Sequence, residues 1–142
     1  MSRYVCRSHK NYKILELVEL SVGRVDECLT HYNGLFYNLQ WTEWKDRDDP
    51  TGLADTETIA GFVLDAAGLE FHEIPDGLCS NPRAAQGRVK ATQQMATTQN
   101  VLMGLDRILM GLDCVNSQND GGCVDYEVRF CCPGNTLSLF KQ

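Results

Sequence analysis

The sequence predicts a mainly β, sandwich-like domain with irregular loops and room for one short helix, stapled by disulfides. Three observations support this fold class. A chain of 142 residues is long enough to bury one hydrophobic core. Apolar and polar residues alternate near its C-terminus, as in a strand with one buried face. Five of its seven cysteines fall within the last 64 residues, and such clustering indicates a covalent framework.

The cysteines also indicate the compartment. Disulfides persist in oxidising surroundings, so the framework predicts a secreted, extracellular protein. Two alternatives stay open: a zinc site, disfavoured because the chain has no C-x-x-C pair, and buried reduced thiols that pack as small apolar side chains. The first residues lack the apolar stretch of about 7–15 residues that marks a secretory signal. We therefore expect the sequence to be a fragment without its signal peptide.

Composition argues against several classes of partner. The chain has 19 acidic and 13 basic residues and a formal net charge of −6, which disfavours nucleic acid. With 43% hydrophobic and 23% charged residues, it is expected to fold rather than stay disordered. No apolar run approaches the roughly 20 residues that cross a bilayer, so we expect no membrane insertion.

The first part of the chain mixes ambiguous and clear segments. Residues 1–36 differ in sequence character from the rest, and we assign them to an N-terminal extension or to the end of a preceding segment. Within them, residues 13–22 fit neither period cleanly and predict either a strand or a short helix. Residues 35–44 are aromatic and alternate well enough to predict a strand. Residues 45–58 are rich in Asp, Gly and Pro and predict a long irregular loop.

The middle of the chain gives weaker signals. Residues 59–69 are apolar, and a short helix near residues 55–65 is compatible with their pattern. Residues 101–106 are nearly repeated as residues 108–113, but two glycines disfavour a helix, and two copies make no coiled coil. This similarity is interpreted as a coincidence or a local duplication.

The last strand is the clearest element. Every second residue from 124 to 130 is apolar and the residues between them are charged, which predicts one buried and one wet face. The apolar positions are Val124, Tyr126, Val128 and Phe130. Cys131 and Cys132 extend this strand. Because neighbouring strand residues point to opposite faces, we expect their sulfurs to bond different partners.

Four segments in a fixed order resemble a known family. They read QWTEWKDRDDP at residues 40–50, DTE at residues 55–57, LCSNP at residues 78–82, and GLDC at residues 111–114 followed by CVDYEVRFCC at residues 123–132. In this order they resemble the WxxW domain, the CysD module of gel-forming mucins, and most of all its branch in cartilage intermediate layer protein. The resemblance covers residues 37–134 and leaves residues 135–142 as a C-terminal tail.

The resemblance implies a disulfide framework that is lighter than in the mucin modules. Leu39 stands where those modules have a cysteine before the first tryptophan, and residues 88–113 contain none. Cys28 or Cys6 would replace the absent partner, which leaves one odd thiol for another chain. The cysteines expected in disulfides are Cys28, Cys79, Cys114, Cys123, Cys131 and Cys132.

The acidic loop is a candidate calcium site, because Ca²⁺ takes about six to eight oxygen ligands and tolerates irregular loops. An EF-hand is excluded, since Pro50 and Thr51 stand where that loop needs a ligand and a glycine. The resemblance independently implies bound calcium here, and a solvated acidic loop is the alternative. The expected ligands are Asp46, Asp48, Asp55 and Glu57.

Trp41 and Trp44 are three residues apart, which on a regular strand places them on opposite faces. One of them would enter the core and the other would lie outside. Their spacing also matches the acceptor pattern for C-mannosylation of the first tryptophan, so Trp41 is a candidate modification site. The alternative is two tryptophans that only pack against long side chains.

Catalytic interpretations find little support. His9, His31 and His72 are scattered, and no nucleophile motif or phosphate-binding glycine pattern occurs. We expect a non-enzymatic extracellular module that associates weakly with a second copy, or with other mucus or matrix proteins. The alternative is a β-sandwich that binds carbohydrate or another small ligand, with Trp44 and Tyr37 stacking on sugar.

Overall fold

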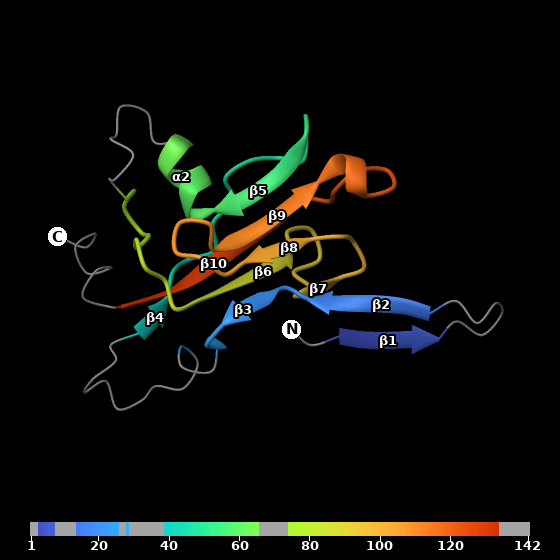
Figure 1. The fold of residues 1–142 in the computed structure, drawn as a ribbon, viewed down its shortest axis with the longest axis horizontal. Coiled ribbons are helices and arrows are strands. Elements are labelled where there is room, and N and C mark those ends of the chain that lie inside the picture. Colours follow the sequence, from blue (N-terminus) through green and yellow to red (C-terminus); the bar gives the residue numbers. More distant parts are fainter. Residues whose placement is uncertain (1–2, 8–13, 26–27, 29–38, 66–73, 134–142) are drawn as a thin grey trace.

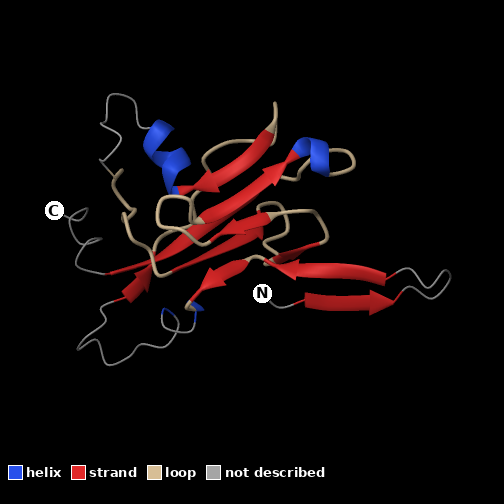
Figure 2. Cartoon of the chain, viewed as in Figure 1, coloured by secondary structure: helices blue, strands red, loops and turns tan. Residues whose placement is uncertain are grey.

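The computed structural model describes residues 3–7, 14–25, 28, 39–65 and 74–133, with side chains from residue 17 onward (Figure 1). Strands and the loops between them make up most of this part of the chain (Figure 2). They form three antiparallel sheets, which confirms the predicted mainly β class. No helix in these ranges is long and apolar enough to cross a membrane.

The four-stranded sheet is built around the predicted C-terminal strand. Its order is β3 (Ser21–Gly23), β6 (Ala84–Val89), β10 (Tyr126–Pro133) and β4 (Leu39–Trp41). Tyr126, Val128 and Phe130 are fully buried, as their alternation predicts. Val124 precedes the strand and is 41% exposed.

A three-stranded sheet packs over it, in the order β5 (Ala54–Thr58), β9 (Gly111–Val115) and β8 (Leu102–Gly104). The two similar segments near residues 101–113 pair with each other here as an antiparallel hairpin. The irregular loop predicted for residues 45–58 is shorter than expected, because residues 54–58 form β5. The helix α2 (Ile59–Asp65) follows β5 directly.

The ambiguous segment near residues 13–22 is β-structure. A hairpin of β1 (Arg3–Arg7) and β2 (Ile14–Glu19) pairs with β7 (Ala96–Thr97) in the third sheet. The chain then passes through Leu20, which has no exposed surface, into β3. Residues that we assigned to an N-terminal extension therefore contribute a strand and a core side chain to the sandwich.

The core lies between the four-stranded sheet and the sheet of β5, β9 and β8. Its large side chains without exposed surface are Leu20, Ile59, Leu112, Tyr126, Val128 and Phe130. Gly87 lets the sheets approach, because a Cβ there would lie 2.7 Å from Leu112 Cδ1. Phe62 of α2 closes one side of the core, with its ring edge-to-face on Phe130 at 6.3 Å.

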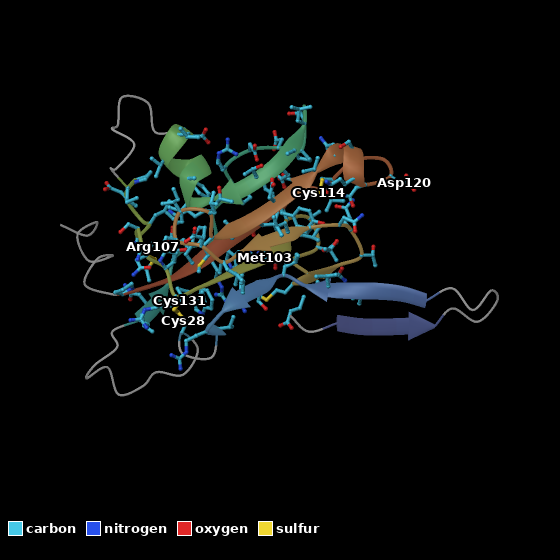
Figure 3. All side chains as sticks on the ribbon, in the orientation of Figure 1. Cys28, Met103, Arg107, Cys114, Asp120 and Cys131 are labelled. Atoms are coloured by element: carbon cyan, nitrogen blue, oxygen red, sulfur yellow. A yellow bond between two sulfur atoms is a disulfide. The ribbon has the colours of Figure 1, made fainter. Side chains whose placement is uncertain are left out.

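The described residues contain three disulfides: Cys28–Cys131 and Cys79–Cys132 join distant parts of the chain, and Cys114–Cys123 joins neighbouring ones. Figure 3 shows Cys28 beside Cys131 at the edge of the sandwich. The adjacent cysteines of β10 thus have different partners, one on each face of the sheet. The third bridge closes the loop that contains the 3₁₀ turn η1 (Asn116–Gln118). Cys6 lies on β1, outside the part of the chain with described side chains.

A buried carboxylate cluster as candidate functional site

Three predicted metal ligands come together where β5 meets the preceding loop. Asp55 and Glu57 stand two residues apart on β5, so their side chains share one face of the strand. Both residues have no exposed surface. Asp48 approaches them from the loop, and one carboxylate oxygen from each residue lies within 4.8 Å of the others. We call Asp48, Asp55 and Glu57 the buried carboxylate cluster.

Backbone N–H groups orient this cluster. Tyr126 donates to Asp55 Oδ2 at 2.7 Å, and Arg47 donates to Glu57 Oε2 at the same distance. Asp48 also donates from its backbone to Glu57 Oε1, at 3.2 Å. Asp55 Oδ1 is the exception, because it is buried and has no N–H or hydroxyl donor; the nearby Asp48 carboxyl group can bond Asp55 only through a shared proton, which raises the pKa of Asp55. A buried carboxylate oxygen without a donor is costly unless something else satisfies it.

Burial dominates the electrostatics of the cluster. Desolvation raises the pKa of Asp55 to about 8 and that of Glu57 to about 10, despite the backbone donors that lower both. Neighbouring carboxylates raise them further. The Arg47 guanidinium pairs with Asp48 of the cluster and with Asp65 outside it, and its ion pairs within the described residues include neither Asp55 nor Glu57. At neutral pH the metal-free cluster therefore holds protons that a cation would displace.

Asp46, the fourth predicted ligand, does not belong to the buried cluster. It groups instead with Asp49 and Asp125 in a second acidic cluster nearer the surface. Lys90 Nζ pairs with Asp46 there and lies 3.7 Å from Asp125 Oδ2. Asp46 and Asp48 lie in irregular chain rather than in a strand, so the alternation that puts residues two apart on one face does not hold for them. The sequence reasoning missed Asp49, Asp125 and Lys90.

The two tryptophans lie on the same face of the sheet, so the prediction of opposite faces is wrong. Trp41 pairs with Cys131, and Thr42 N–H donates to Phe130 O, but the next bridge joins Lys45 to Val128. Two residues, Glu43 and Trp44, therefore stand opposite Arg129 alone. This extra residue is a β-bulge, and it shifts the alternation so that Trp44 rejoins the face of Trp41.

On this face the indole rings alternate with guanidinium groups, in an arrangement that we call the tryptophan–arginine ladder. The Arg129 guanidinium carbon lies 4.5 Å from the ring centre of Trp41 and 4.8 Å from that of Trp44. Arg88 lies 4.0 Å from Trp44. These distances are within the range of cation–π attraction. Gln86 Oε1 accepts from Arg129 Nε and Nη2, and these two bonds fix the orientation of the guanidinium group.

The sequence analysis did not predict either arginine as part of a site. Arg129 could have been found, because it occupies one of the charged positions that alternate with the buried residues of the last strand.

The ladder also affects the roles expected for the aromatic residues. Trp41 is half-buried, and its Nε1 has no hydrogen-bond partner. Two guanidinium groups already lie over Trp44, which leaves less of its ring for sugar. Tyr37 and the three histidines fall outside the described residues.

Two hollows in the described surface lack aromatic linings. One is bordered by Leu17, Glu19, Gln94, Met95 and Ala96. The other is polar and lies between the loops at residues 98–100 and 117–120. Neither has the aromatic platform that the carbohydrate interpretation requires.

Comparison with known proteins identifies the family. The family described as "Mucin-2 protein WxxW repeating region" matches residues 41–132. The chain belongs to this WxxW family. The matched segment contains both tryptophans, the buried carboxylate cluster, and the disulfides Cys79–Cys132 and Cys114–Cys123. Leu20 and Cys28 precede it, so the packed unit of this WxxW module extends beyond the family match.

Two curated relatives are similar to the WxxW module. Cartilage intermediate layer protein 1 of Mus musculus is 31% identical over 100 residues, and that of Homo sapiens is 32% identical over 100 residues. Each alignment covers 69% of this chain and 8% of the relative. The chain thus matches a small part of these relatives. No solved structure showed significant similarity to the chain.

Proposed function

We propose that this WxxW module is a non-enzymatic structural unit of a secreted mucus or matrix protein, ordered by one calcium ion and capable of weak self-association. Family membership and relatives named for the cartilage intermediate layer support the structural role. Three disulfides support an oxidising, extracellular setting. In such a setting the partners would be a second copy or other matrix proteins.

The observation that carries the calcium proposal is Asp55 Oδ1, a fully buried oxygen without a donor beside two other carboxylates. A cation would satisfy this oxygen and offset the repulsion within the cluster. The donor set consists of carboxylate oxygens, which suits a hard cation rather than a soft metal. Calcium fits better than magnesium, because magnesium keeps several waters and demands near-ideal octahedral geometry.

Calcium bound there would connect three parts of the module. Asp48 belongs to the loop after the tryptophans, Asp55 and Glu57 belong to β5, and Asp55 also accepts from the backbone of β10. The ion would therefore fix the loop against both sheets. Extracellular modules commonly bind calcium with Kd of about 10⁻⁴–10⁻³ M, so we expect a site of that strength.

Thermal melting with and without calcium tests this site. Calcium at about 100 times Kd should stabilise the fold by about 2.7 kcal/mol. For a chain of this size the melting temperature should rise by about 5–10 °C. The variant Asp55→Asn should lose this response, yet melt no lower than the parent protein in chelator, because the amide is uncharged like the protonated carboxyl group and its oxygen can still accept from Tyr126 N–H.

The matched control is Asp49→Asn, which changes an acidic residue of the exposed second cluster and should keep the full calcium response. Equal melting temperatures of the parent protein in saturating calcium and in chelator would contradict the calcium proposal. Self-association is tested separately, by sedimentation from about 1 to 300 μM, a range that covers weak specific contacts. A single monomeric species throughout would contradict it.

A further inference from the structure

The connection between β8 and β9 exposes an apolar surface. Residues 105–109 are all exposed, and three of them are aliphatic: Leu105 is 72% exposed, Leu109 54% and Ile108 37%. We call residues 105–109 the leucine loop. Single exposed aliphatic residues are common, but several within one short loop indicate an interaction site.

The leucine loop is held in place by its backbone. Ala60 N–H of α2 donates to Ile108 O at 2.6 Å, and Ile59 N–H donates to Met110 O at 3.2 Å. Two buried methionines flank the loop: Met103 lies on β8, and Met110 immediately precedes β9. A Cβ on Gly104 would lie only 2.1 Å from Leu109 O, so the hairpin closes tightly. The aliphatic side chains are thus presented on a preorganised support, which lowers the entropy cost of binding.

Charge at the tip of the leucine loop indicates what covers it. Asp106 and Arg107 are adjacent, exposed and opposite in charge, and neither takes part in a side-chain ion pair within the described residues. When two copies meet across a two-fold axis, a contact between one residue of the first copy and a different residue of the second copy occurs twice, once in each direction. Asp106 of each copy would then face Arg107 of the other, giving two ion pairs at the rim of an apolar contact.

The position of the leucine loop also favours a second copy despite the net charge of −6. The loop itself is neutral and precedes Gly111 at one end of β9. Near the other end of β9, Asp55 pairs with Cys114 and accepts from the backbone of Tyr126, which follows Asp125 of the second acidic cluster. Figure 3 shows Arg107 and Asp120 at opposite ends of the sandwich. Charges separated by more than about 8 Å are largely screened at physiological ionic strength.

We propose that the leucine loop is the homotypic contact of this module: two copies associate across a two-fold axis, with Leu105, Ile108 and Leu109 packed together and Asp106 paired with Arg107 of the second copy. This inference rests on the proposed self-association and names its surface. An anionic membrane is a poorer occupant, because the chain carries an excess of negative charge.

The first test removes the apolar contact. Sedimentation is measured on the full chain carrying Cys6→Ser, so that no intermolecular disulfide contributes. Leu105→Ser with Leu109→Ser should raise the dimer Kd at least about a hundredfold, since anchors at the centre of an interface dominate affinity. Leu53→Ser is the control, because Leu53 is 87% exposed and lies before β5, at the other end of that strand from α2. Melting temperatures check that all variants fold.

The second test exchanges charges. Asp106→Arg alone and Arg107→Asp alone should each weaken self-association about tenfold or more, because each places like charges face to face. Mixing the two variants should restore association as a heterodimer, because one of its two ion pairs is unchanged and the other has its charges reversed. This rescue is specific for the proposed pairing, since a merely structural effect of either substitution would persist in the mixture.

The outcomes separate the two proposals. If the parent protein remains monomeric, self-association fails, and the homotypic contact fails with it. If the parent protein dimerises but the leucine and charge variants dimerise equally well, only the leucine loop is overturned. Weakening by the leucine variants together with rescue in the mixed sample supports the contact as described.

Discussion

The backbone N–H of Tyr126 donates to Asp55 Oδ2 at 2.7 Å, across 71 residues of sequence. This bond joins the first residue of β10 to β5, and hence the two sheets of the sandwich. Tyr126 is itself fixed, because its hydroxyl bonds to Thr97 Oγ1 and to Gln99 Oε1, each at 2.8 Å. The ionisation state of Asp55 therefore affects the contact between the sheets, which leads to the first prediction.

Without metal, the stability of the module should fall as pH rises. The folded pKa values of Asp55 and Glu57, about 8 and about 10, lie above their ordinary values because of burial. The folded state then binds more protons than the unfolded state from about pH 4 upward, so the free energy of unfolding decreases with pH. Melting in chelator between pH 5 and pH 8 should show this decrease, and Asp55→Asn should reduce it.

Saturating calcium should remove most of this pH dependence, because the ion favours the ionised carboxylates. The rise in melting temperature caused by calcium should accordingly be larger at pH 8 than at pH 5. A calcium effect that is independent of pH would show that the ion binds outside the buried carboxylate cluster.

The tryptophan–arginine ladder should depend on the planar guanidinium of Arg129. Arg129→Lys keeps the charge but loses the surface that lies over two rings and the two bonds to Gln86. We expect a loss of about 1–2 kcal/mol in the free energy of unfolding and a change in tryptophan fluorescence. Arg107→Lys is the control, measured at low concentration, and should leave both unchanged. Identical fluorescence in Arg129→Lys would contradict the ladder.

Gly111 should not tolerate a side chain. Its φ is +135°, and a Cβ would lie 2.1 Å from the carbonyl oxygen of Glu57 on the neighbouring strand. Gly111→Ala must therefore push β9 away from β5, and we expect a loss of about 3 kcal/mol or more together with weaker calcium binding. Gly121→Ala provides the comparison, since its φ is +75° with no atom within 4 Å, and should cost only about 1–2 kcal/mol. Equal losses in denaturant unfolding would contradict this distinction.

The disulfides should differ in how much they stabilise the fold. Cys28–Cys131 and Cys79–Cys132 span 103 and 53 residues, whereas Cys114–Cys123 spans 9. In the chain-entropy account, the two long loops contribute about 4–5 kcal/mol each and the short loop about 3 kcal/mol. Replacing each pair by serine and measuring unfolding tests this order. Peptide mapping without reductant should find Cys131 and Cys132 joined to different partners, and either one as a free thiol would contradict the pairing.

The sequence predicted the features that depend on neighbouring residues. Alternation identified β10 and its buried face, and it also indicated that Cys131 and Cys132 point apart. The segment at residues 13–22 stayed ambiguous because, besides the nearby β1, it pairs with β6 and β7, which lie far along the chain. Pairing with those strands, rather than local propensity, decides its structure.

The sequence by itself thus determined the class of fold, the disulfide-rich character and the acidic segment that contains the candidate ligands. Only the tertiary structure decided which acids meet, because Asp48 reaches Asp55 and Glu57 across a loop while Lys90 pairs with Asp46. It also decided the faces of Trp41 and Trp44. The β-bulge opposite Arg129 depends on the register between β10 and the chain after β4. Register between distant strands is set by packing of the whole core, and no local pattern encodes it.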